Sequence, residues 1–398
     1  MGSLLVLNAG SSSLKFASYP ATGGDALLHG QLAWHEGELQ MRARRTDGSL
    51  LVDEQQPGGH AYDPAQGLTW LMAWLDSHGH DAELGGGVAA VGHRVVHGGA
   101  HHTQPVKVTP TVLDELDRLC PLAPLHQPHN LAAIRHLASH HPALPQVACF
   151  DTAFHATQPW AEQALALPRS LTEQGVRRYG FHGLSYEYIA RRLPEWLGDR
   201  AAGRVIVAHL GSGASLCAMQ GGRSVGSTMG FSALDGLMMG TRCGSIDPGV
   251  LLYLMQHEGM DAAALTSLLY KQSGLLGVSG VSADMAALLA SEAPHAQEAV
   301  ALFNHRVVRE VGALTAVLGG LDALVFTAGI GEHAAPVRAA VVRALGWLGL
   351  SLDEAANASH ATFISPADSR VPVLVVPTDE EAMLALHTRE VLFSPGQP

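Results

Sequence analysis

Two arginines, Arg94 and Arg242, lie in apolar or glycine-rich segments, where burying a positive charge is unfavourable unless the arginine binds an anion. Arg94 interrupts an apolar run that ends in the Gly98-Gly99 turn, and Arg242 lies in a glycine-rich segment shortly before Pro248. A guanidinium is rarely buried unpaired, and its planar fork matches the oxygens of a carboxylate or a phosphate. For Arg94 alone, a structural salt bridge is an equally good interpretation. Both residues are therefore candidates for binding an anionic substrate.

Acidic, aromatic and histidine side chains gather at further points of the chain. Asp151 directly follows the apolar run 146–150, a position that catalytic acids and helix N-caps both occupy. Residues 177–183, with the sequence RRYGFHG, would make a poor core element and suit the wall of a site. Three acids at 379–381 fit either a capped helix N-terminus or a magnesium site. These segments add candidate catalytic and metal-binding groups to the two arginines.

Small-residue turns follow apolar strands near the start of each half of the chain. The turn at residues 8–13, NAGSSS, follows a run at 4–7, and Gly211-Ser212-Gly213 follows a run at 205–210. The backbone N–H groups and serine hydroxyls of such a hairpin tip can hold phosphate oxygens. One such turn is usually only a turn, but two predict a duplicated domain that closes on a nucleotide. A Gly-x-Gly turn at 329–331, between a strand and a helix, is a weaker sign of the same kind.

The elements that would position these groups repeat the same order in each half. Alternating apolar residues predict a β-meander in the first half, then helices and strands in alternation, with strands at 4–8, 14–19, 27–34, 37–43, 49–53, 89–97 and 146–150 and helices at 64–77, 111–119 and 130–140. The second half repeats this pattern, with strands at 204–210, 214–219, 222–227, 322–327 and 371–376 and helices at 248–257, 261–271, 282–290, 295–318 and 380–393. We therefore expect an α/β protein of two like domains.

Composition excludes several classes of function. The chain has 398 residues, 15% of them charged, and a formal net charge of −12, which argues against binding to nucleic acid or an anionic membrane. No basic, apolar signal peptide opens the sequence, so we expect a soluble, cytoplasmic protein. Its four cysteines are far apart and indicate neither a zinc site nor a disulfide framework. The histidine groups 97, 101, 102 and 136, 140, 141 lack partners at ligand spacing, and we expect solvated surface side chains there.

Ten segments, in the same order and across essentially the whole chain, resemble the acetate kinase family: LNAGSSSLK, GHRVVHGG, APLHQP, FDTAFH, RRYGFHG, HLGSGAS, MGTRCGSIDPG, SGLLGVSG, FTAGIGE and PTDEE. The resemblance implies two ribonuclease-H-like domains, as in sugar kinases, heat-shock chaperones and actin, with a nucleotide cleft between them. It implies reversible, magnesium-dependent phosphoryl transfer from ATP to acetate in a homodimer, with manganese as a possible substitute. The domains implied are residues 1–151 with 382–398, and a nucleotide-binding domain of 152–381, hinged near 151–152 and 381–382.

The resemblance also implies roles for individual residues. Arg94 and Arg242 would hold the charges of acetate and of the transferring phosphoryl group, joined by His182 at the transition state. Asp151 would orient these groups or handle a proton, and orientation is favoured because a carboxylate needs no base to become a nucleophile. The implied magnesium ligands are Asn8 and Glu380. The implied methyl pocket consists of Val96, Leu125, Phe181 and Ala233, with His126 nearby. The implied ATP-binding residues are Lys15, His209, Leu210, Gly211, Ser212, Gly213, Asp284, Met285, Ala286, Gly329, Ile330, Gly331, Glu332 and His333.

Six positions depart from the family pattern. Four of them, Ser212, Ala286, His333 and Asp379, lie near the implied nucleotide or metal and bear on ATP affinity and base selectivity. Ala233 stands where proline is usual and bears on acyl-chain length, and Leu184 replaces a threonine.

Two alternatives to an acetate kinase follow from the same residues. Propionate or butyrate kinase differs from it only in pocket volume. A chaperone or actin-like ATPase is disfavoured because Arg94 and Arg242 would have no role in water-mediated hydrolysis, and because 398 residues leave no separate partner-binding domain.

Overall fold

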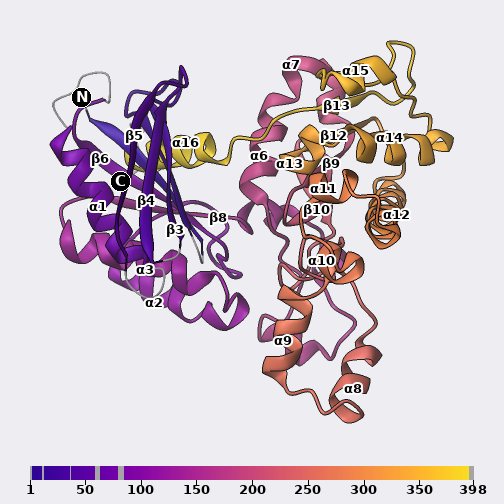
Figure 1. Ribbon diagram of the computed structural model, residues 1–398, viewed down its shortest axis with the longest axis horizontal. Coiled ribbons are helices and arrows are strands. Elements are labelled where there is room, and N and C mark those ends of the chain that lie inside the picture. Colours follow the sequence, from indigo (N-terminus) through magenta and orange to yellow (C-terminus); the bar gives the residue numbers. More distant parts are fainter. Residues whose placement is uncertain (1, 11–12, 36, 59–62, 79–84, 394–398) are drawn as a thin grey trace. The chain divides into compact units, whose positions relative to one another are not determined.

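The computed structural model describes residues 2–10, 13–35, 37–58, 63–78 and 85–393. The chain forms two compact units, the first made of residues up to Ala153 and from Asp379 onward, the second of Phe154–Thr378 (Figure 1). The predicted domains, 1–151 with 382–398 and 152–381, remain a prediction, because a compact unit need not be the unit that moves in function. None of the described helices is long and apolar enough to cross a bilayer.

One eight-stranded sheet organises the first unit, in the order β5-β4-β3-β2-β1-β6-β8-β7. The first five strands form an antiparallel meander, and β6 and β8 run parallel to β1. The predicted meander is thereby confirmed. The bounds are β1 (Ser3–Ala9), β2 (Ser13–Pro20), β3 (Leu28–His35), β4 (Glu38–Arg45), β5 (Leu50–Pro57), β6 (Val88–Val95), β7 (Val106–Lys107) and β8 (Gln146–Phe150).

Helices cover both faces of this sheet. Alternate strand residues such as Val91 belong to a core that includes residues of α1 (Pro64–Ser77) and α3 (Gln127–His140). The next residue, Gly92, faces α16 (Glu380–Phe393), where an added Cβ would lie 2.2 Å from Thr388 Oγ1. Side chains alternate across a strand, so Arg94 points to the same face as Gly92 and α16. A further helix, α2 (Pro110–Asp117), packs against α3.

A five-stranded sheet organises the second unit, in the order β11-β10-β9-β12-β13. Its strands β9 to β11 are antiparallel, while β12 and β13 run parallel to β9. This arrangement repeats the order β3-β2-β1-β6-β8 of the first unit, so the predicted α/β fold with two like sheets is confirmed. The bounds are β9 (Arg204–Leu210), β10 (Ala214–Gln220), β11 (Arg223–Ser227), β12 (Ala323–Thr327) and β13 (Val373–Val375).

Twelve described helices belong to the second unit, and the 25-residue α12 packs on β9, β10 and β11. Their bounds are α4 (Trp160–Gln163), α5 (Arg169–Glu173), α6 (Gly183–Arg192), α7 (Pro194–Leu197), α8 (Pro248–Gln256), α9 (Ala262–Lys271), α10 (Gly274–Ser279), α11 (Met285–Leu289), α12 (Pro294–Leu318), α13 (Ala328–His333), α14 (Ala335–Ala344) and α15 (Glu354–Ala358).

Two predictions about these helices are wrong. The expected Gly-x-Gly turn at 329–331 is helical, because α13 begins directly after β12. The expected helix at 282–290 is reduced to α11, since Asp284 caps it by accepting a hydrogen bond from the Ala287 N–H at 2.8 Å. Helices that were not predicted from the sequence are α4, α5, α6, α7, α10, α14 and α15. Helix α6 starts from His182 in a left-handed conformation (φ 60°), which hydrophobic periodicity does not reveal.

Candidate functional site

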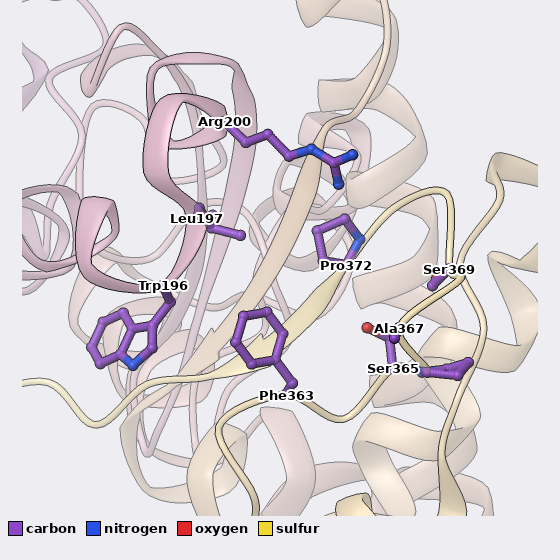
Figure 2. Close-up of a pocket in the computed structure, with 9 residues that line it drawn as sticks. Trp196, Leu197, Arg200, Phe363, Ser365, Ala367, Ser369 and Pro372 are labelled. Carbon is purple, nitrogen blue, oxygen red and sulfur yellow. The ribbon is translucent and has the colours of Figure 1, made fainter.

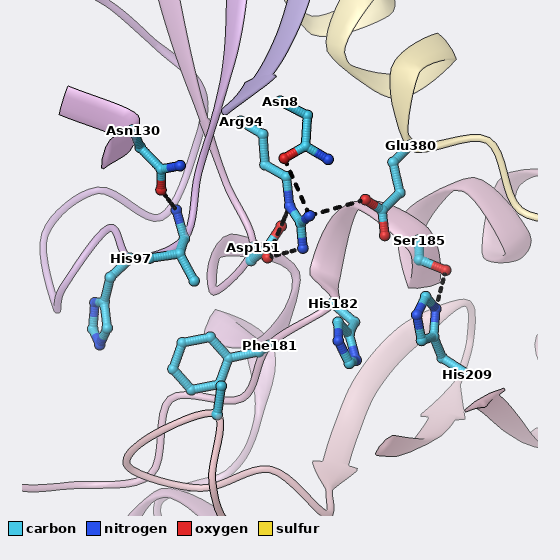
Figure 3. Close-up of polar contacts among 12 residues, drawn as sticks. Asn8, Arg94, His97, Asn130, Asp151, Phe181, His182, Ser185, His209 and Glu380 are labelled. Atoms are coloured by element: carbon cyan, nitrogen blue, oxygen red, sulfur yellow. Dashed lines mark hydrogen bonds and ion pairs between the residues drawn. The ribbon is translucent and has the colours of Figure 1, made fainter. Parts of the chain in front are cut away.

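In the first unit, Arg94 lies at the centre of a charged cluster at the carboxyl ends of the strands (Figure 3). Its Nε and Nη2 donate to the two carboxylate oxygens of Asp151, at 3.0 and 2.6 Å. Its Nη1 lies 3.4 Å from Asn8 Oδ1 and 3.6 Å from a carboxylate oxygen of Glu380. Burial alone would lower the pKa of Arg94, but the charges of Asp151 and Glu380 outweigh burial and raise it. The guanidinium is therefore permanently charged and oriented by its partners.

Strand register explains why these residues meet. In the parallel pair β1–β6, Leu7 is opposite His93, so the next residues, Asn8 and Arg94, are neighbours. Asp151 follows β8 and its N–H donates to Val95 O at 3.1 Å, which holds it beside β6. The Asp151 side chain is only 1% exposed. The salt-bridge interpretation of Arg94 is therefore correct as geometry, and the cluster is also placed where α/β folds carry catalytic groups.

The three acids at the start of α16, Asp379, Glu380 and Glu381, each have a different partner. Asp379 accepts a hydrogen bond from the Ala382 N–H at 2.8 Å, as a helix cap does. Glu380 contacts Arg94, and Glu381 bonds His29 Nδ1 at 3.0 Å. The hydrogen bond to Glu381 raises the pKa of His29. Of the three acids, only Glu380 reaches the charged cluster.

Asn8 and Glu380 fit the chemistry of a magnesium site. Their oxygens lie within 3.4 and 3.6 Å of the same Arg94 nitrogen, so they converge on one small region. An amide oxygen and a carboxylate are donors that Mg²⁺ accepts, and it usually retains several waters beside one or two carboxylates.

The residues of the predicted methyl pocket in the first unit lie next to β6. Val96 is nearly buried, and its N–H donates to Asn130 Oδ1 at 3.0 Å. Leu125 and His126 are half-buried and directly precede α3. The prediction that His97 is a surface residue is wrong, since its ring is fully buried and Nδ1 accepts the Gly99 N–H at 2.8 Å. The backbone of His97 is held as well, since its N–H donates to Gln127 Oε1 at 3.1 Å and its carbonyl accepts from Gln127 Nε2 at 3.0 Å.

His182 belongs to a chain of hydrogen bonds in the second unit. Its Nδ1 bonds Ser215 Oγ at 2.8 Å, and this hydroxyl also bonds Tyr186 Oη at 2.6 Å. The His182 ring stacks on His209 with centroids 4.2 Å apart. His209 Nδ1 bonds Ser185 Oγ at 2.8 Å. This network fixes both imidazole rings, as Figure 3 shows for His182, His209 and Ser185.

Arg242 and His182 converge on the tip of the β9–β10 hairpin. A Cβ added to Gly213 would lie 3.3 Å from His182 Nε2 and 3.6 Å from Arg242 Nη2. Arg242 Nη1 donates to Ala233 O at 2.8 Å, and the Gly240 N–H donates to Ser212 O at 3.0 Å. The tip therefore brings a cation, an imidazole and glycine backbone together, which is a suitable environment for an anion. In the other hairpin, the predicted tip residues Ser11 and Ser12 lie outside the described residues.

The remaining predicted residues of the second unit differ in how they are placed. Phe181 is nearly buried, and its carbonyl accepts a hydrogen bond from His155 Nε2 at 2.8 Å. The side chains of Leu210 and Met285 are buried, whereas Gly329 and His333 are exposed. In the first unit, Lys15 is exposed on β2, opposite Asn8 in the hairpin.

Both ends of α13 are closed by side chains of the protein. Glu332, predicted to contact the nucleotide, turns its carboxylate back to accept the Ala328 N–H at 2.8 Å. At the other end Arg338 donates to the carbonyls of Gly331 and Glu332, at 2.9 and 2.7 Å. Arg338 is fully buried, and burial lowers its pKa to about 10. The α13 N-terminus is thus already occupied by a carboxylate in this structure.

Sequence reasoning missed the hydroxyl groups that hold the two histidines. Ser185 and Tyr186 follow His182 by three and four residues on α6, a spacing that places them on one helix face. That spacing could have indicated them. Ser215 and Thr378 gave no local signal, although Thr378 Oγ1 donates to Ser185 Oγ at 2.8 Å.

The fold and these groups define an α/β protein with two sheets of one topology and polar clusters at the carboxyl ends of their strands. Residues 3–386 match the model of the acetokinase family, and the chain belongs to that family.

Similar proteins cover nearly the full length of the chain. The acetate kinase of Rhodopseudomonas palustris (strain ATCC BAA-98 / CGA009) is 55% identical over 391 residues, which are 96% of this chain and 97% of the relative. The acetate kinase of Rhizobium meliloti is 49% identical over 399 residues and all of both chains. Among solved structures, a propionate kinase from Francisella tularensis gives a TM-score of 0.90 at 36% identity, covering 98% of this chain and 100% of that one. Porphyromonas gingivalis acetate kinase gives 0.87 at 37%, with the same coverage.

Proposed function

We propose that this protein is an acetate kinase, which transfers a phosphoryl group reversibly from ATP to acetate and yields acetyl phosphate and ADP. The observation that carries the proposal is the near full-length likeness to the acetate kinases of R. palustris and R. meliloti. In the reaction an acetate oxygen forms a bond to the γ-phosphorus while the bond between that phosphorus and the ADP oxygen breaks. Acetate is already ionised at neutral pH, so no general base is required.

In this proposal the groups of the first unit bind acetate and the metal. Arg94 pairs with the acetate carboxylate, and Asp151 orients Arg94 through its two hydrogen bonds, at 3.0 and 2.6 Å. Asn8 and Glu380 hold the magnesium ion that the family typically uses with ATP. Bound magnesium would neutralise charge on the phosphate oxygens. Manganese is an alternative with similar ligand preferences.

The groups of the second unit then bind the nucleotide and the transferring group. Arg242 and the Nε2 of His182 stabilise the equatorial oxygens of the phosphoryl group, and residues 209–213 at the hairpin tip contact the nucleotide. The remaining nucleotide contacts come from Lys15 of the first unit and from 284–286 and 329–333. A loose phosphoryl-transfer transition state requires positioning and positive charge rather than covalent catalysis, and these residue types supply both.

We also propose that the chain acts as a homodimer in which α8 contributes to the interface. This helix has no buried residue, and Val250, Leu252, Tyr253 and Met255 are each 40–56% exposed. Exposed apolar groups in such a cluster mark an interaction surface. Leu252→Glu should shift the sedimentation coefficient toward that of the monomer, whereas Glu292→Gln, at an exposed site between α11 and α12, should not.

A panel of carboxylic acids tests the reaction. The protein is incubated with Mg-ATP and acetate, propionate or butyrate, and hydroxylamine traps the acyl phosphate for detection. Acetate should give the highest kcat/KM. A higher value with propionate would support the runner-up, propionate kinase, which the likeness to the F. tularensis structure favours. ATP hydrolysis that is independent of every acid would reject both, in favour of a chaperone-like or actin-like ATPase.

A further inference from the structure

A cavity of about 450 Å³ lies in the second unit at the amino-terminal ends of β9 and β13 (Figure 2). Its walls include Trp196, Leu197, Arg200, Phe363, Ser365 and Pro372. The groups assigned above to phosphoryl transfer lie at the other ends of the same strands, where β9 ends in the 211–213 hairpin tip. The cavity is therefore separate from that site. Its volume falls within the range of small-molecule pockets, about 300–1,000 Å³.

Two aromatic side chains give this cavity flat, fixed walls. The segment that carries Phe363 pairs with β13, through hydrogen bonds from the Val375 N–H to Thr362 O at 2.8 Å and from the Ile364 N–H to Val373 O at 2.9 Å. Phe363 is nevertheless 40% exposed. Trp196 packs against the core of the second unit. The guanidinium carbon of Arg192 lies over its ring, 5.6 Å from the ring centroid. Rings that are held in place can bind a flat apolar group at little cost in side-chain entropy.

Arg200 gives the cavity a cation, although the nearby carboxylate of Asp322 offsets part of its charge. Within the described part of the chain, its guanidinium makes no hydrogen bond or ion pair. The neighbouring carboxylate, Asp322, is already held by Arg204 Nε and Nη2 at 2.9 and 2.7 Å. Ser365 Oγ accepts the Val373 N–H at 3.0 Å, so its hydroxyl hydrogen can be donated to a ligand. The available donors of the cavity are thus Arg200 and Ser365, because the third polar side chain, Ser369, already donates its hydroxyl hydrogen to Val371 O at 2.8 Å.

We propose that this cavity binds a small organic monoanion with a flat, apolar body, such as an aromatic carboxylate or sulfonate. The body lies between Trp196 and Phe363, and the anionic group pairs with Arg200. Acetate is too small to fill 450 Å³ and has no flat surface to stack. A polyphosphate is disfavoured because one guanidinium in a chain of net charge −12 would leave most of its charge unpaired.

A small molecule fits this cavity better than a protein partner does. A stable protein interface needs about 800 Å² from each partner, with hydrophobic residues at its centre. Here the apolar surface is confined to a concavity with one charge at its side. The apolar surface suited to a second copy of this chain is instead the exposed α8 helix.

The test uses two fluorescent probes of similar shape, anilinonaphthalene sulfonate and the uncharged N-phenylnaphthylamine. Both are titrated into the full-length protein and into three variants: Arg200→Gln, Phe363→Ala and the control Arg309→Gln, which removes an exposed charge from α12. Arg200→Gln should weaken the sulfonate about five- to tenfold and leave the neutral probe unchanged. Phe363→Ala should weaken both probes, and Arg309→Gln neither.

Fluorine NMR locates the probe when all tryptophans carry fluorine. The Trp196 resonance is the one that disappears in Trp196→Phe, and it should shift as the sulfonate saturates. A Trp196 resonance that does not move, or a sulfonate Kd unchanged by Arg200→Gln, would overturn the proposal. Probe-induced dimerisation in sedimentation would also overturn it, since the cavity would then belong to an interface between copies. Thermal unfolding of each variant confirms that it is folded before titration.

Discussion

The two units place different chemistry at equivalent positions of the same sheet. The hairpins β1–β2 and β9–β10 each end in one last pair of facing residues, Ala9 with Leu14 and Leu210 with Ala214. The residue just before that pair is Asn8 in β1 and His209 in β9, so these two residues are equivalent. On the parallel neighbour β6, Arg94 is opposite Asn8, because Leu7 pairs with His93. On the parallel neighbour β12, Thr327 is opposite His209, so Thr327 is equivalent to Arg94. Extending the registers of β8 and β13 in the same way makes Asp151 equivalent to Thr378. An amide, a cation and an acid in one unit therefore correspond to an imidazole and two hydroxyls in the other.

This difference separates the contribution of the fold from that of the side chains. The topology delivers three neighbouring side chains to the carboxyl end of each sheet, whatever their types. In the first unit these side chains are held by charge, whereas in the second His209 and Thr378 are held by neutral hydrogen bonds to Ser185 Oγ. The buried hydroxyl of the third residue, Thr327, has no hydrogen-bond partner among the described residues. Charged hydrogen bonds are about twice as strong as neutral ones, so the two clusters should respond differently to substitution.

The largest effect on stability is expected when Asp151 is replaced by threonine, the residue type of its equivalent, Thr378. Asp151→Thr leaves Arg94 without its main partner, and breaking a buried ion pair costs about 3–5 kcal/mol. The free energy of unfolding of the first unit should fall by about 3 kcal/mol, the lower end of this range, because Arg94 remains 23% exposed. Hydrogen exchange of residues 88–95 measures this loss. The matched change Thr378→Val should cost only about 1 kcal/mol, read from residues 204–210. Equal costs would show that charge does not distinguish the two clusters.

Arg242 tests whether the second unit supplies the charge for catalysis, although the cluster at its strand ends is held by neutral hydrogen bonds. Arg242→Lys keeps the charge but loses the planar fork that donates to Ala233 O. We expect kcat to fall about ten- to a thousandfold. Steady-state kinetics with varied ATP and acetate measures this fall, and Arg223→Lys, at an exposed arginine on β11, is the control. A change confined to the KM for ATP would remove Arg242 from the chemical step.

Ser215 sharpens the comparison within the second unit, because one hydroxyl holds both His182 and Tyr186. Ser215→Ala removes one of the two hydrogen-bond partners of the buried Tyr186 phenol and leaves the other, the His209 backbone, in place. The loss of one hydrogen bond should cost about 1 kcal/mol of stability. With His182 less constrained, kcat should fall about tenfold while the KM for acetate changes little. Urea unfolding and kinetics on the same preparation separate the two effects. Ser232→Ala is a control at a half-buried serine outside the network.

Much of this arrangement could be predicted from the sequence, because strands and charges leave local signals. The run into Gly98-Gly99 indicated a strand with Arg94 inside it, and the acids at 379–381 indicated a helix start. The pairing of Arg94 with Asp151, 57 residues apart, was open because a salt bridge and an anion site use the same residue types.

Other features left no such signal. The left-handed His182 and the bond from Tyr186 to Ser215 depend on tertiary contacts that no local pattern encodes. Arg338 is similar, since several of its partners are backbone carbonyls that any sequence possesses. Its side-chain partners, Asn357 and His360, lie 19 and 22 residues away in the chain.

A smaller effect is expected for the acyl chain. The family resemblance implies a proline at the position of Ala233 and places this residue in the acyl pocket. Because alanine leaves more room than proline, we expect an extra substrate methylene to gain up to about 0.8 kcal/mol, roughly fourfold in binding. Acetate should remain the main substrate, with appreciable propionate activity. Ala233→Pro should shift the kcat/KM ratio toward acetate, and the backbone carbonyl that binds Arg242 is retained. If this ratio does not change, position 233 does not set acyl length.

The smallest effect concerns the charged pair at the start of α16. Because Glu381 raises the pKa of His29 above its ordinary value of 6.5, the folded state binds the proton more tightly than the unfolded state. The stabilisation is therefore fully present below about pH 6.5 and is lost as pH rises through the folded pKa. His29 is 44% exposed, which limits the gain to about 0.5 kcal/mol. His29→Gln should lower stability at about pH 5.5 but not at about pH 8.5, measured by urea unfolding at both values. His35→Gln, at an exposed histidine at the other end of the same strand, should show no such difference. An equal loss at both pH values would mean that His29 stabilises the first unit by packing and not by its charge.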